Sequence, residues 1–393
     1  MYPTLYHAFL DLFGLDIPFL KFLNSFGFFV ALAFVFASWT LALELKRKAN
    51  EGILRPIEKT IIIGAPASPM ELLVNGLIGF IIGWKLFHLL LDPQASLSDP
   101  QGFLLSDEGN IAGGILLAAL AIWMKWREKK KKQLEKPRQE KVLMQPQDHA
   151  GNITLTAALW GLIGAKLFHW MENPDELASF IQDPSPSNLF SGLTMYGGLI
   201  LAGAMVIRYF KRNGIPPLHG ADAAAPGVML AYAIGRMGCQ VSGDGDWGIV
   251  NNATRPSWIP QWLWAYDYPN NVNGVGVPIT EGTCFPGYCT VLPEPVFPTP
   301  LYEITVCLLF FGLLWAMRKK ARPAGMIFFS YLILNGIERF FIEKIRVNVR
   351  VWGDITQAEI IAVLLVLAGI AGIIWIRGKK NKEDGPITAD TSG

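Results

Sequence analysis

The stretches AYAIGRMGCQ (residues 231–240) and LNGIERFFIEKIR (residues 334–346) each place an arginine within an apolar run of membrane length. Arg236 comes near the end of a run that begins near residue 223, and Arg339 near the end of one that begins near residue 324. A guanidinium group in hydrocarbon costs at least about 3 kcal/mol, so it usually marks a site with a partner. Because its rigid donor fork matches phosphate or carboxylate, these positions favour a lipid phosphate as the partner.

The composition excludes an ordinary soluble domain. Of the 393 residues, 51% are hydrophobic and only 17% are charged, and the mean hydropathy is +0.32, as is typical of polytopic membrane proteins. We expect an all-α integral membrane protein with about nine transmembrane helices, each long enough or nearly so to cross a hydrocarbon core ~30 Å thick. The predicted spans lie near residues 24–44, 73–91, 109–125, 153–171, 193–210, 223–241, 299–317, 324–342 and 358–377.

The charges of the connecting loops predict the orientation of these spans. Lys and Arg gather after alternate spans, as in residues 125–141, whereas residues 92–108 and 172–192 contain acids and no Lys or Arg. The positive-inside rule then places the N-terminus outside and the C-terminus in the cytoplasm. No cleavable signal peptide is expected, because the first residues lack a basic n-region. The short span 109–125 is alternatively a re-entrant or interfacial segment.

The long loop 244–298 is predicted to form an extracytoplasmic cap rich in Trp, Tyr, Pro and Asn. Its aromatic side chains would rest on lipid headgroups or contact a peptide substrate. Cys284 and Cys289 lie in this loop, where an oxidising compartment permits a local disulfide, and a reduced pair is the alternative. Cys239 and Cys307 lie within spans and are expected to be small packing residues.

Residues 73–125 and 153–210 are predicted to be two copies of one helical hairpin. The tract KLFH at residues 85–88 recurs at 166–169, and both copies end in a basic loop, so they form a parallel repeat. The first copy has Ala112 where the second has Tyr196, as expected if the first copy lost its chemistry. The predicted divisions are a first helix with its basic loop (1–60), an extra hairpin (61–145), a core that includes the cap loop (146–377) and a polar cytoplasmic tail (378–393).

Polar side chains are expected to meet at the outer ends of the fourth to eighth spans. Depth follows from position along each span, because a helix rises ~1.5 Å per residue. Such a layer indicates one site. Its members are Lys166, His169, Thr194, Tyr196, Arg236, Cys239, Gln240, Asp244, Tyr302, Glu303, Glu338, Arg339 and Glu343.

Simpler interpretations compete for several of these residues. Tyr196 and Tyr302 also fit an aromatic belt at the membrane interface. Glu343 with Arg346, or Glu338 with Arg339, also fits a purely structural ion pair. Cations near span ends commonly extend to the interface, which applies to Lys85, His88, Lys166 and His169.

These residues carry a resemblance to a known family. Residues 235–248, GRMGCQVSGDGDWG, resemble the signature G-R-x-G-N-F-x-N-G-E-x-W-G of the bacterial prolipoprotein diacylglyceryl transferases. Four further segments are similar to family motifs in the same order. They are TMYGG (194–198, for S/T-F-H-G-G), PTPLYE (298–303, for H-P-S-Q-L-Y-E), GIERFFIEKIR (336–346, for R-F-x-x-E-x-x-R) and DITQAEIIA (354–362, for L-T-x-G-Q). The resemblance covers nearly all spans but omits the hairpin 73–125.

The resemblance implies a multi-pass transferase of the bacterial cytoplasmic (inner) membrane. Such an enzyme moves the diacylglyceryl group of phosphatidylglycerol to the thiol of the lipobox cysteine of a prolipoprotein, leaving glycerol-1-phosphate. By position, Arg236 and Arg339 would grip the lipid phosphate, and Asp244 and Glu343 match family glutamates with an expected catalytic role. Supporting positions implied by the motifs are Gly197, Gly198, Gly235, Gly238, Cys239, Tyr302, Glu303 and Arg346.

The sequence also departs from the family motifs. Tyr196 replaces the family histidine, Phe26 a family tyrosine and Cys239 the signature asparagine, and one extra residue lies between Gly243 and Trp247. The incoming thiol must become a thiolate, so a base is required. Tyr196 and His169, one helix earlier, are the two candidates.

Two other functions fit the same sequence. One is a non-catalytic protein that binds or moves phospholipid, which the replaced signature residues motivate. The other is a transporter of an anionic solute, which the outer-leaflet position of the polar layer and the parallel repeat disfavour. Phosphatidylglycerol, the lipobox peptide and membrane lipid are the expected partners. The basic loop 125–141 is expected to bind anionic lipid and not nucleic acid, and no cofactor or metal is expected.

Overall fold

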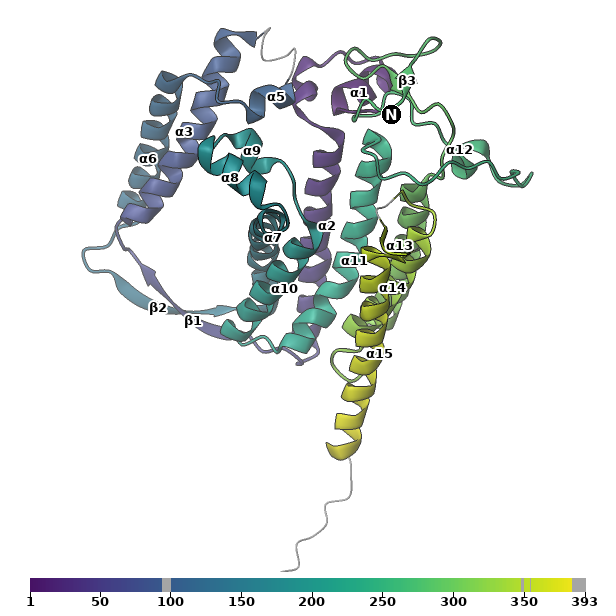
Figure 1. The fold of residues 1–393 in the computed structure, drawn as a ribbon. Coiled ribbons are helices and arrows are strands. Elements are labelled where there is room, and N and C mark those ends of the chain that lie inside the picture. Colours follow the sequence, from purple (N-terminus) through teal and green to yellow (C-terminus); the bar gives the residue numbers. More distant parts are fainter. Residues whose placement is uncertain (94–99, 348–349, 354, 384–393) are drawn as a thin grey trace, which may run out of the picture. The chain divides into compact units, whose positions relative to one another are not determined.

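The computed structural model describes residues 1–93, 100–347, 350–353 and 355–383 and is largely helical (Figure 1). Contacts divide the chain into two compact units. The first comprises residues 1–54, 146–154 and 207–393, and the second residues 55–145 and 155–206. This grouping places the second predicted hairpin with the first one, whereas the sequence division assigned it to the core.

The first unit contains a helical bundle and a loop-rich cap. Its short N-terminal elements are α1 (Leu5–Phe13) and η1 (Pro18–Phe22), followed by the long helix α2 (Ser25–Asn50). The remaining elements are η2 (Pro146–His149), α11 (Pro217–Ser242), α12 (Gln261–Trp264), β3 (Val277–Pro278), β4 (Thr290–Val291), α13 (Thr299–Met317), α14 (Met326–Glu343), β5 (Arg350–Trp352), β6 (Ile355–Thr356) and α15 (Gln357–Glu383).

Helix α11 is the centre of the first unit, packed against α2, α13 and α14, while α15 packs on α14 (Figure 1). Small residues permit the close contacts. A Cβ atom on Gly227 would lie 2.6 Å from the Thr40 hydroxyl of α2, and one on Gly336 would lie 2.5 Å from the Ala362 carbonyl of α15. The core between α11, α13 and α14 includes Met229 and Cys307, both 0% exposed. Close backbone packing of this kind substitutes for the hydrophobic driving force that is absent in lipid.

A buried carboxylate fixes one end of this bundle. Asp222 on α11 accepts hydrogen bonds from the backbone N–H groups of Gly325 (2.7 Å) and Phe328 (2.9 Å), at the start of α14. The Lys48 ammonium group of α2 lies 4.0 Å from the same carboxylate. Because a helix N-terminus favours negative charge, Asp222 joins α2, α11 and α14 through one side chain.

The second unit contains two hairpins with matching contacts. Its elements are the ribbon β1 (Ile57–Ile63) and β2 (Arg138–Met144), α3 (Pro69–Leu91), α5 (Pro100–Leu105), α6 (Ile111–Lys132), the greater part of α7 (Ala150–Glu172), α8 (Pro174–Gln182), α9 (Pro186–Phe190) and most of α10 (Met195–Arg212).

The glycines that lie two residues before each KLFH tract show the match between the hairpins. Gly83 packs on the Gly113 carbonyl and the Leu117 Cβ atom. In the second hairpin, Gly164 packs on the Gly197 carbonyl and the Leu201 Cβ atom.

The tract lysines also match. Lys85 donates to the carbonyl oxygens of Phe103 (2.6 Å) and Glu108 (2.8 Å), and Lys166 donates to those of Asn188 (3.0 Å) and Ser191 (2.7 Å). Each lysine therefore closes the loop of its own hairpin, which is a structural role.

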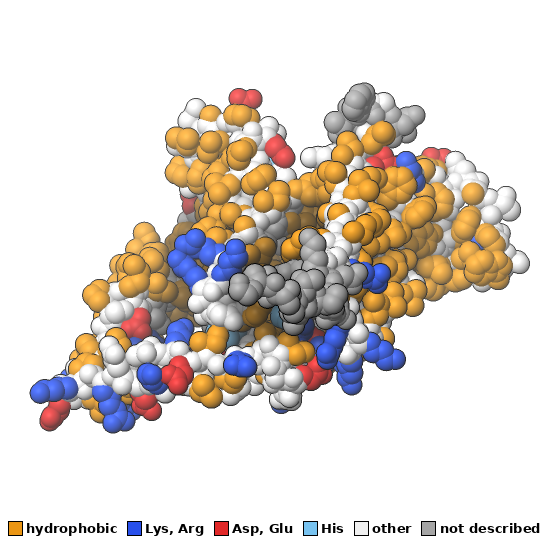
Figure 2. All heavy atoms as spheres, turned by 90° about the horizontal axis from the view of Figure 1, so that it is seen from below, with side chains coloured by type: hydrophobic (Ala, Val, Ile, Leu, Met, Phe, Trp, Pro, Cys, Tyr) orange, Lys and Arg blue, Asp and Glu red, His pale blue; other side chains and the backbone are white. Residues whose placement is uncertain are grey.

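Each of the nine predicted spans lies within a helix, apart from one or two residues at the start of some spans, and residues 111–125 of the segment 109–125 belong to the 22-residue helix α6. Four helices of the described residues are long and apolar enough to cross a membrane, namely α2, α3, α13 and residues 357–378 of α15. Large apolar side chains cover much of the exposed surface (Figure 2), including Ile81 (59%) and Ile374 (66%). This surface is expected of a protein solvated by lipid tails. The chain is thus a helical membrane protein.

The cap loop holds a small core of its own and the Cys284–Cys289 disulfide, with a Cα–Cα distance of 5.0 Å. Tyr268, 1% exposed, packs against Trp247 and Tyr266. In contrast, Trp258 of the same loop is 81% exposed. Of the two alternatives for this cysteine pair, a disulfide or two reduced thiols, the structure has the disulfide.

His7 connects the N-terminal helix α1 to this cap. Its ring centroid lies 4.6 Å from that of Phe285 and 5.6 Å from that of Tyr288, and Nδ1 lies 2.9 Å from the Thr4 hydroxyl. Burial, with a smaller contribution from Lys21, lowers the pKa of His7 from 6.5 to about 4. The neutral ring is thus the form that packs in the folded protein.

Acidification is expected to release α1 from the cap. A folded-state pKa below the unfolded value gives stability that is present above pH 6.5 and lost as the pH falls towards 4. The loss reaches up to about 2 kcal/mol near pH 5. Hydrogen exchange of residues 1–24, corrected for the intrinsic rate, should rise between about pH 7 and about pH 5. A His7→Gln variant should lose this dependence, and an equal rise in that variant would contradict the assignment.

Candidate active site

The end of α11 positions the first polar groups of the site. Gly243 adopts a left-handed conformation with φ of 65°, and its N–H donates to the Cys239 carbonyl (2.9 Å), which terminates the helix. A residue with a side chain is strained in this conformation. The chain therefore turns back over the last helical turns, which brings Asp246 beside Arg236.

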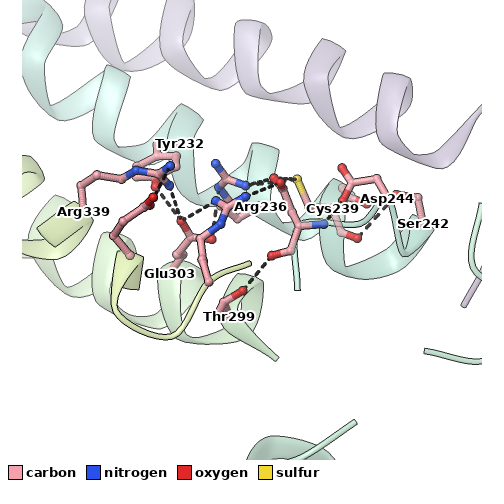
Figure 3. Close-up of polar contacts among 12 residues, drawn as sticks. Tyr232, Arg236, Cys239, Ser242, Asp244, Thr299, Glu303 and Arg339 are labelled. Carbon is pink, nitrogen blue, oxygen red and sulfur yellow. Dashed lines mark hydrogen bonds and ion pairs between the residues drawn. The ribbon is translucent and has the colours of Figure 1, made fainter. Parts of the chain in front are cut away.

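Glu303 of α13 is the centre of the cluster (Figure 3). Its carboxylate is 0% exposed and accepts a hydrogen bond of 2.8 Å from the Tyr232 hydroxyl. Three guanidinium groups approach it, from Arg236 (3.4 Å), Arg339 (3.7 Å) and Arg346 (3.8 Å). Residues of α11 and α14, together with Arg346 just after α14, thus share one buried carboxylate of α13.

Two further carboxylates complete the pairing of the arginines. Arg339 contacts Glu343 one turn later on α14, at 3.1 Å. Asp246 bridges the other two guanidinium groups, since Oδ2 accepts from Arg236 and Oδ1 from Arg346. The ion pairs of the cluster therefore join three guanidinium groups and three carboxylates, and the buried Glu338 carboxylate of α14 lies beside them, next to Tyr232 and Arg339.

The backbone around Asp246 is held independently of its side chain. The Thr299 hydroxyl donates to the Asp246 carbonyl (2.7 Å), and the Gly248 N–H donates to the Phe297 carbonyl (2.8 Å). Gly248 also packs directly on the Ile345 carbonyl, where a Cβ atom would clash. These contacts join the loop after α11 to the start of α13 and the end of α14.

The surroundings of the two aspartates in the loop after α11 shift their pKa values in opposite directions. Burial raises the pKa of Asp244, and the neighbouring Asp246 raises it further. Burial also acts to raise the pKa of Asp246, but the guanidinium groups of Arg236 and Arg346 outweigh it and hold the pKa below its usual range. Asp246 is thus the anionic partner of the arginines, with its N–H 3.3 Å from Asp244 Oδ1.

Cys239 lies beside the same pair, with its sulfur 3.5 Å from Asp246 Oδ2 and 3.6 Å from Arg236 Nη1. Ligand atoms of Cys239, Asp244 and Asp246 lie within 4.8 Å of one another, close enough for a metal ion. Both Asp246 oxygens already accept from guanidinium groups, so this set is a poor cation site.

Most site residues predicted on the first unit meet in this cluster. Arg236, Arg339, Arg346, Glu303 and Glu343 pair directly, and Asp244 and Cys239 lie beside them. Glu343 and Arg346 each pair with other members of the cluster. These ion pairs are therefore structural contacts and parts of the candidate site at the same time.

Three other predicted residues of the first unit have different surroundings. The Tyr302 hydroxyl donates to the Leu263 carbonyl (2.8 Å) and anchors the cap loop. Gly238 packs on Phe26 and Phe29 of α2, whereas the space beside Gly235 is open. Gly238 thus serves the packing of α11 on α2.

Asp246 and Tyr232 were missed at the sequence level. Tyr232 precedes Arg236 by one helical turn, which places both on one face of α11. The extra residue between Gly243 and Trp247 makes the match to the signature glutamate ambiguous. Counting forward from Gly243 matches Asp244 to that glutamate and passes over Asp246. The second aspartate of the segment GDGD was the available signal.

His169 and Tyr196 belong to the second unit. His169 Nε2 lies 2.6 Å from the Glu176 carboxylate, and Gly192 packs on the imidazole ring. Tyr196 is partly buried near the start of α10, where Gly197 packs on Phe168. It stays a prediction that one of these two residues is the base and that it lies near the arginines.

Comparisons with known proteins give a consistent result. The family model described as prolipoprotein diacylglyceryl transferase matches residues 111–375, more than half of the chain. Curated relatives carry the name phosphatidylglycerol–prolipoprotein diacylglyceryl transferase. One from Leptospira interrogans is 27% identical over 285 residues, covering 59% of this chain and 81% of the relative. One from Corynebacterium efficiens is 32% identical (57% and 66%), and one from Staphylococcus carnosus is 29% identical (58% and 75%).

Removing the charge of Glu303 is expected to destabilise the protein. Glu303→Gln leaves three guanidinium groups in a buried site with one carboxylate fewer, at a cost of about 3–5 kcal/mol. Thermal unfolding in detergent measures the loss. The neighbouring Tyr302→Phe removes one hydrogen bond and should cost about 1 kcal/mol. Equal unfolding temperatures for the two variants would show that Glu303 is not the centre of the charge pairing.

Proposed function

The chain belongs to the prolipoprotein diacylglyceryl transferase family, and on that premise we propose that its arginine cluster binds the phosphate of phosphatidylglycerol. The protein transfers the diacylglyceryl group of phosphatidylglycerol to prolipoproteins, the first step of lipoprotein maturation. The observation that supports the proposed site is the convergence of Arg236, Arg339 and Arg346 in a largely buried cluster.

The chemistry of the transfer explains the need for these cations. The thiol sulfur of the lipobox cysteine attacks the glycerol carbon of the lipid, a carbon–sulfur bond forms and the carbon–oxygen bond to phosphate breaks. Glycerol-1-phosphate leaves with the electron pair. Guanidinium groups placed at the leaving phosphate stabilise its growing charge, and they act more strongly in a site with little water. Arg236 and Arg339 are proposed to provide this stabilisation, and Arg346 to support them.

The thiol proton requires a base, for which Tyr196 and His169 are proposed. Tyr196 stands at the position of the family histidine. His169 lies one helix earlier, and the Glu176 carboxylate at 2.6 Å orients its ring. A tyrosinate and an imidazole are both chemically competent to accept a thiol proton.

The proposed topology follows from the loop charges. We place nine helices across the bacterial cytoplasmic (inner) membrane, with the N-terminus outside and the C-terminal tail in the cytoplasm. The cap loop then lies on the outer face, where the lipobox peptide arrives. The exposed Trp258 (81%) and Trp262 (55%) are proposed to contact lipid headgroups or this peptide.

Replacing both tryptophans should change the KM for the lipobox peptide without changing the amount of protein that inserts into the membrane.

Transfer of a labelled diacylglyceryl group from phosphatidylglycerol to a lipobox peptide tests the arginine cluster. Arg236→Ala and Arg339→Ala should each lower turnover by about 100-fold or more, because a charge-stabilising donor is lost. The matched control is Arg138→Ala, at an arginine whose side chain is 73% exposed on β2, and it should keep wild-type turnover. Full turnover in either cluster variant would refute the phosphate site.

The same assay identifies the base. Tyr196→Phe and His169→Ala are expected to differ in kcat. The variant that lacks the base should lose kcat, and the other should largely keep it. Unchanged kcat in both variants would exclude both residues. Absence of turnover in folded wild-type protein that still binds phosphatidylglycerol would favour the non-catalytic lipid-binding function, which the replaced signature residues Tyr196 and Phe26 motivate.

A further inference from the structure

We propose that the Asp246 carboxylate occupies the anion position between Arg236 and Arg346 when no lipid is bound, and that the lipid phosphodiester displaces it. The inference rests on the proposed phosphate site. It makes Asp246 an internal competitor of the substrate and a determinant of the affinity for phosphatidylglycerol.

The contact pattern of Asp246 is the one expected of a bound phosphodiester. Its two oxygens each accept from a different guanidinium group, Oδ2 from Arg236 and Oδ1 from Arg346. A phosphodiester also presents two anionic oxygens, and arginine binds carboxylate and phosphate with the same donor geometry. A lipid phosphate that bound these guanidinium groups would therefore meet Asp246 in its place.

Exposure distinguishes Asp246 from the other carboxylates that pair with the three arginines. The side chains of Glu303 and Glu343 are 0% exposed, whereas that of Asp246 is 33% exposed. Glu303 and Glu343 therefore serve as permanent counter-ions of the cluster. Asp246 lies where the cluster meets its surroundings, so it can leave without exposing the buried pairs.

The charge balance of the cluster favours replacement of the Asp246 carboxylate by the phosphodiester over binding of the phosphodiester as an additional anion. The cluster pairs three guanidinium groups with three carboxylates. A phosphodiester that entered beside Asp246 would place a second anion on Arg236 and Arg346, and like charges at close range repel strongly where little water screens them. If the Asp246 side chain swings out into solvent, the phosphodiester restores the original balance.

The loop can release the side chain without unfolding. Its backbone is fixed by the bonds from Thr299 to the Asp246 carbonyl and from Gly248 to Phe297. The hydrogen bonds and ion pairs of the Asp246 side chain join it to Arg236, Arg346 and the Cys239 thiol. Rotation about the side-chain bonds is therefore sufficient to release it.

The first experiment compares Asp246→Asn with the wild type in the transfer assay, with phosphatidylglycerol varied in phosphatidylcholine vesicles. Asparagine keeps the shape but removes the competing charge, so the apparent KM for phosphatidylglycerol should fall about fivefold or more. The kcat should change much less than the KM. The matched control, Asp267→Asn, removes one charge from an exposed position of the same cap loop and should leave the KM unchanged. An unchanged or higher KM in Asp246→Asn would overturn the inference.

A second experiment uses the wild-type protein and does not depend on how the variant folds. Carbodiimide-coupled amine labelling, read by mass spectrometry, measures how available each carboxylate is. Labelling of Asp246 should increase when the protein is moved from phosphatidylcholine nanodiscs to nanodiscs that contain phosphatidylglycerol. The exposed Asp267 is the internal reference. Constant or reduced labelling of Asp246 would contradict displacement.

The two experiments separate this inference from the proposed function. If wild-type protein turns over and loses activity in Arg236→Ala, but Asp246→Asn has an unchanged KM, only the displacement of Asp246 fails. If wild-type protein shows no turnover, the transferase assignment fails, and the labelling experiment still decides whether phosphatidylglycerol displaces Asp246.

Discussion

The pairing of one buried carboxylate with three guanidinium groups is the constraint on which the site depends. Charged side chains at membrane depth persist only when they are paired. Glu303 provides that pairing for Arg236, Arg339 and Arg346, and Tyr232 donates a further hydrogen bond to it. A cluster neutralised in this way stays ordered without substrate, so the enzyme does not have to assemble its cations when the lipid arrives.

The helices that carry this cluster are fixed at both ends of the bundle. At one end, Asp222 joins α11 to the start of α14, and at the other, Glu303 joins α13 to α11 and α14. The fixed frame contrasts with the side chain of Asp246, which is 33% exposed and contacts Arg236, Arg346 and the Cys239 thiol. A rigid cation frame with one exchangeable anion suits the proposed binding and release of a charged headgroup.

The two hairpins of the second unit make matching packing contacts although some of their polar residues differ. Gly83 and Gly164 make equivalent contacts across their hairpins, and Lys85 and Lys166 each close their own loop. Packing depends on the glycines and lysines, which both copies retain.

The helical membrane architecture, the importance of Arg236 and Arg339 and the family could be predicted from the sequence, because hydropathy, loop charge and short ordered motifs are local properties of the chain. The tertiary structure decided which groups meet. It selected Asp246 over Asp244 as the partner of the arginines, turned Tyr302 towards the cap and formed the Cys284–Cys289 disulfide. The physical reason is that an ion pair depends on distance in space. The extra residue before Trp247 shifts the loop, and only the packing of α11, α13 and α14 decides which carboxylate reaches Arg236 and Arg346.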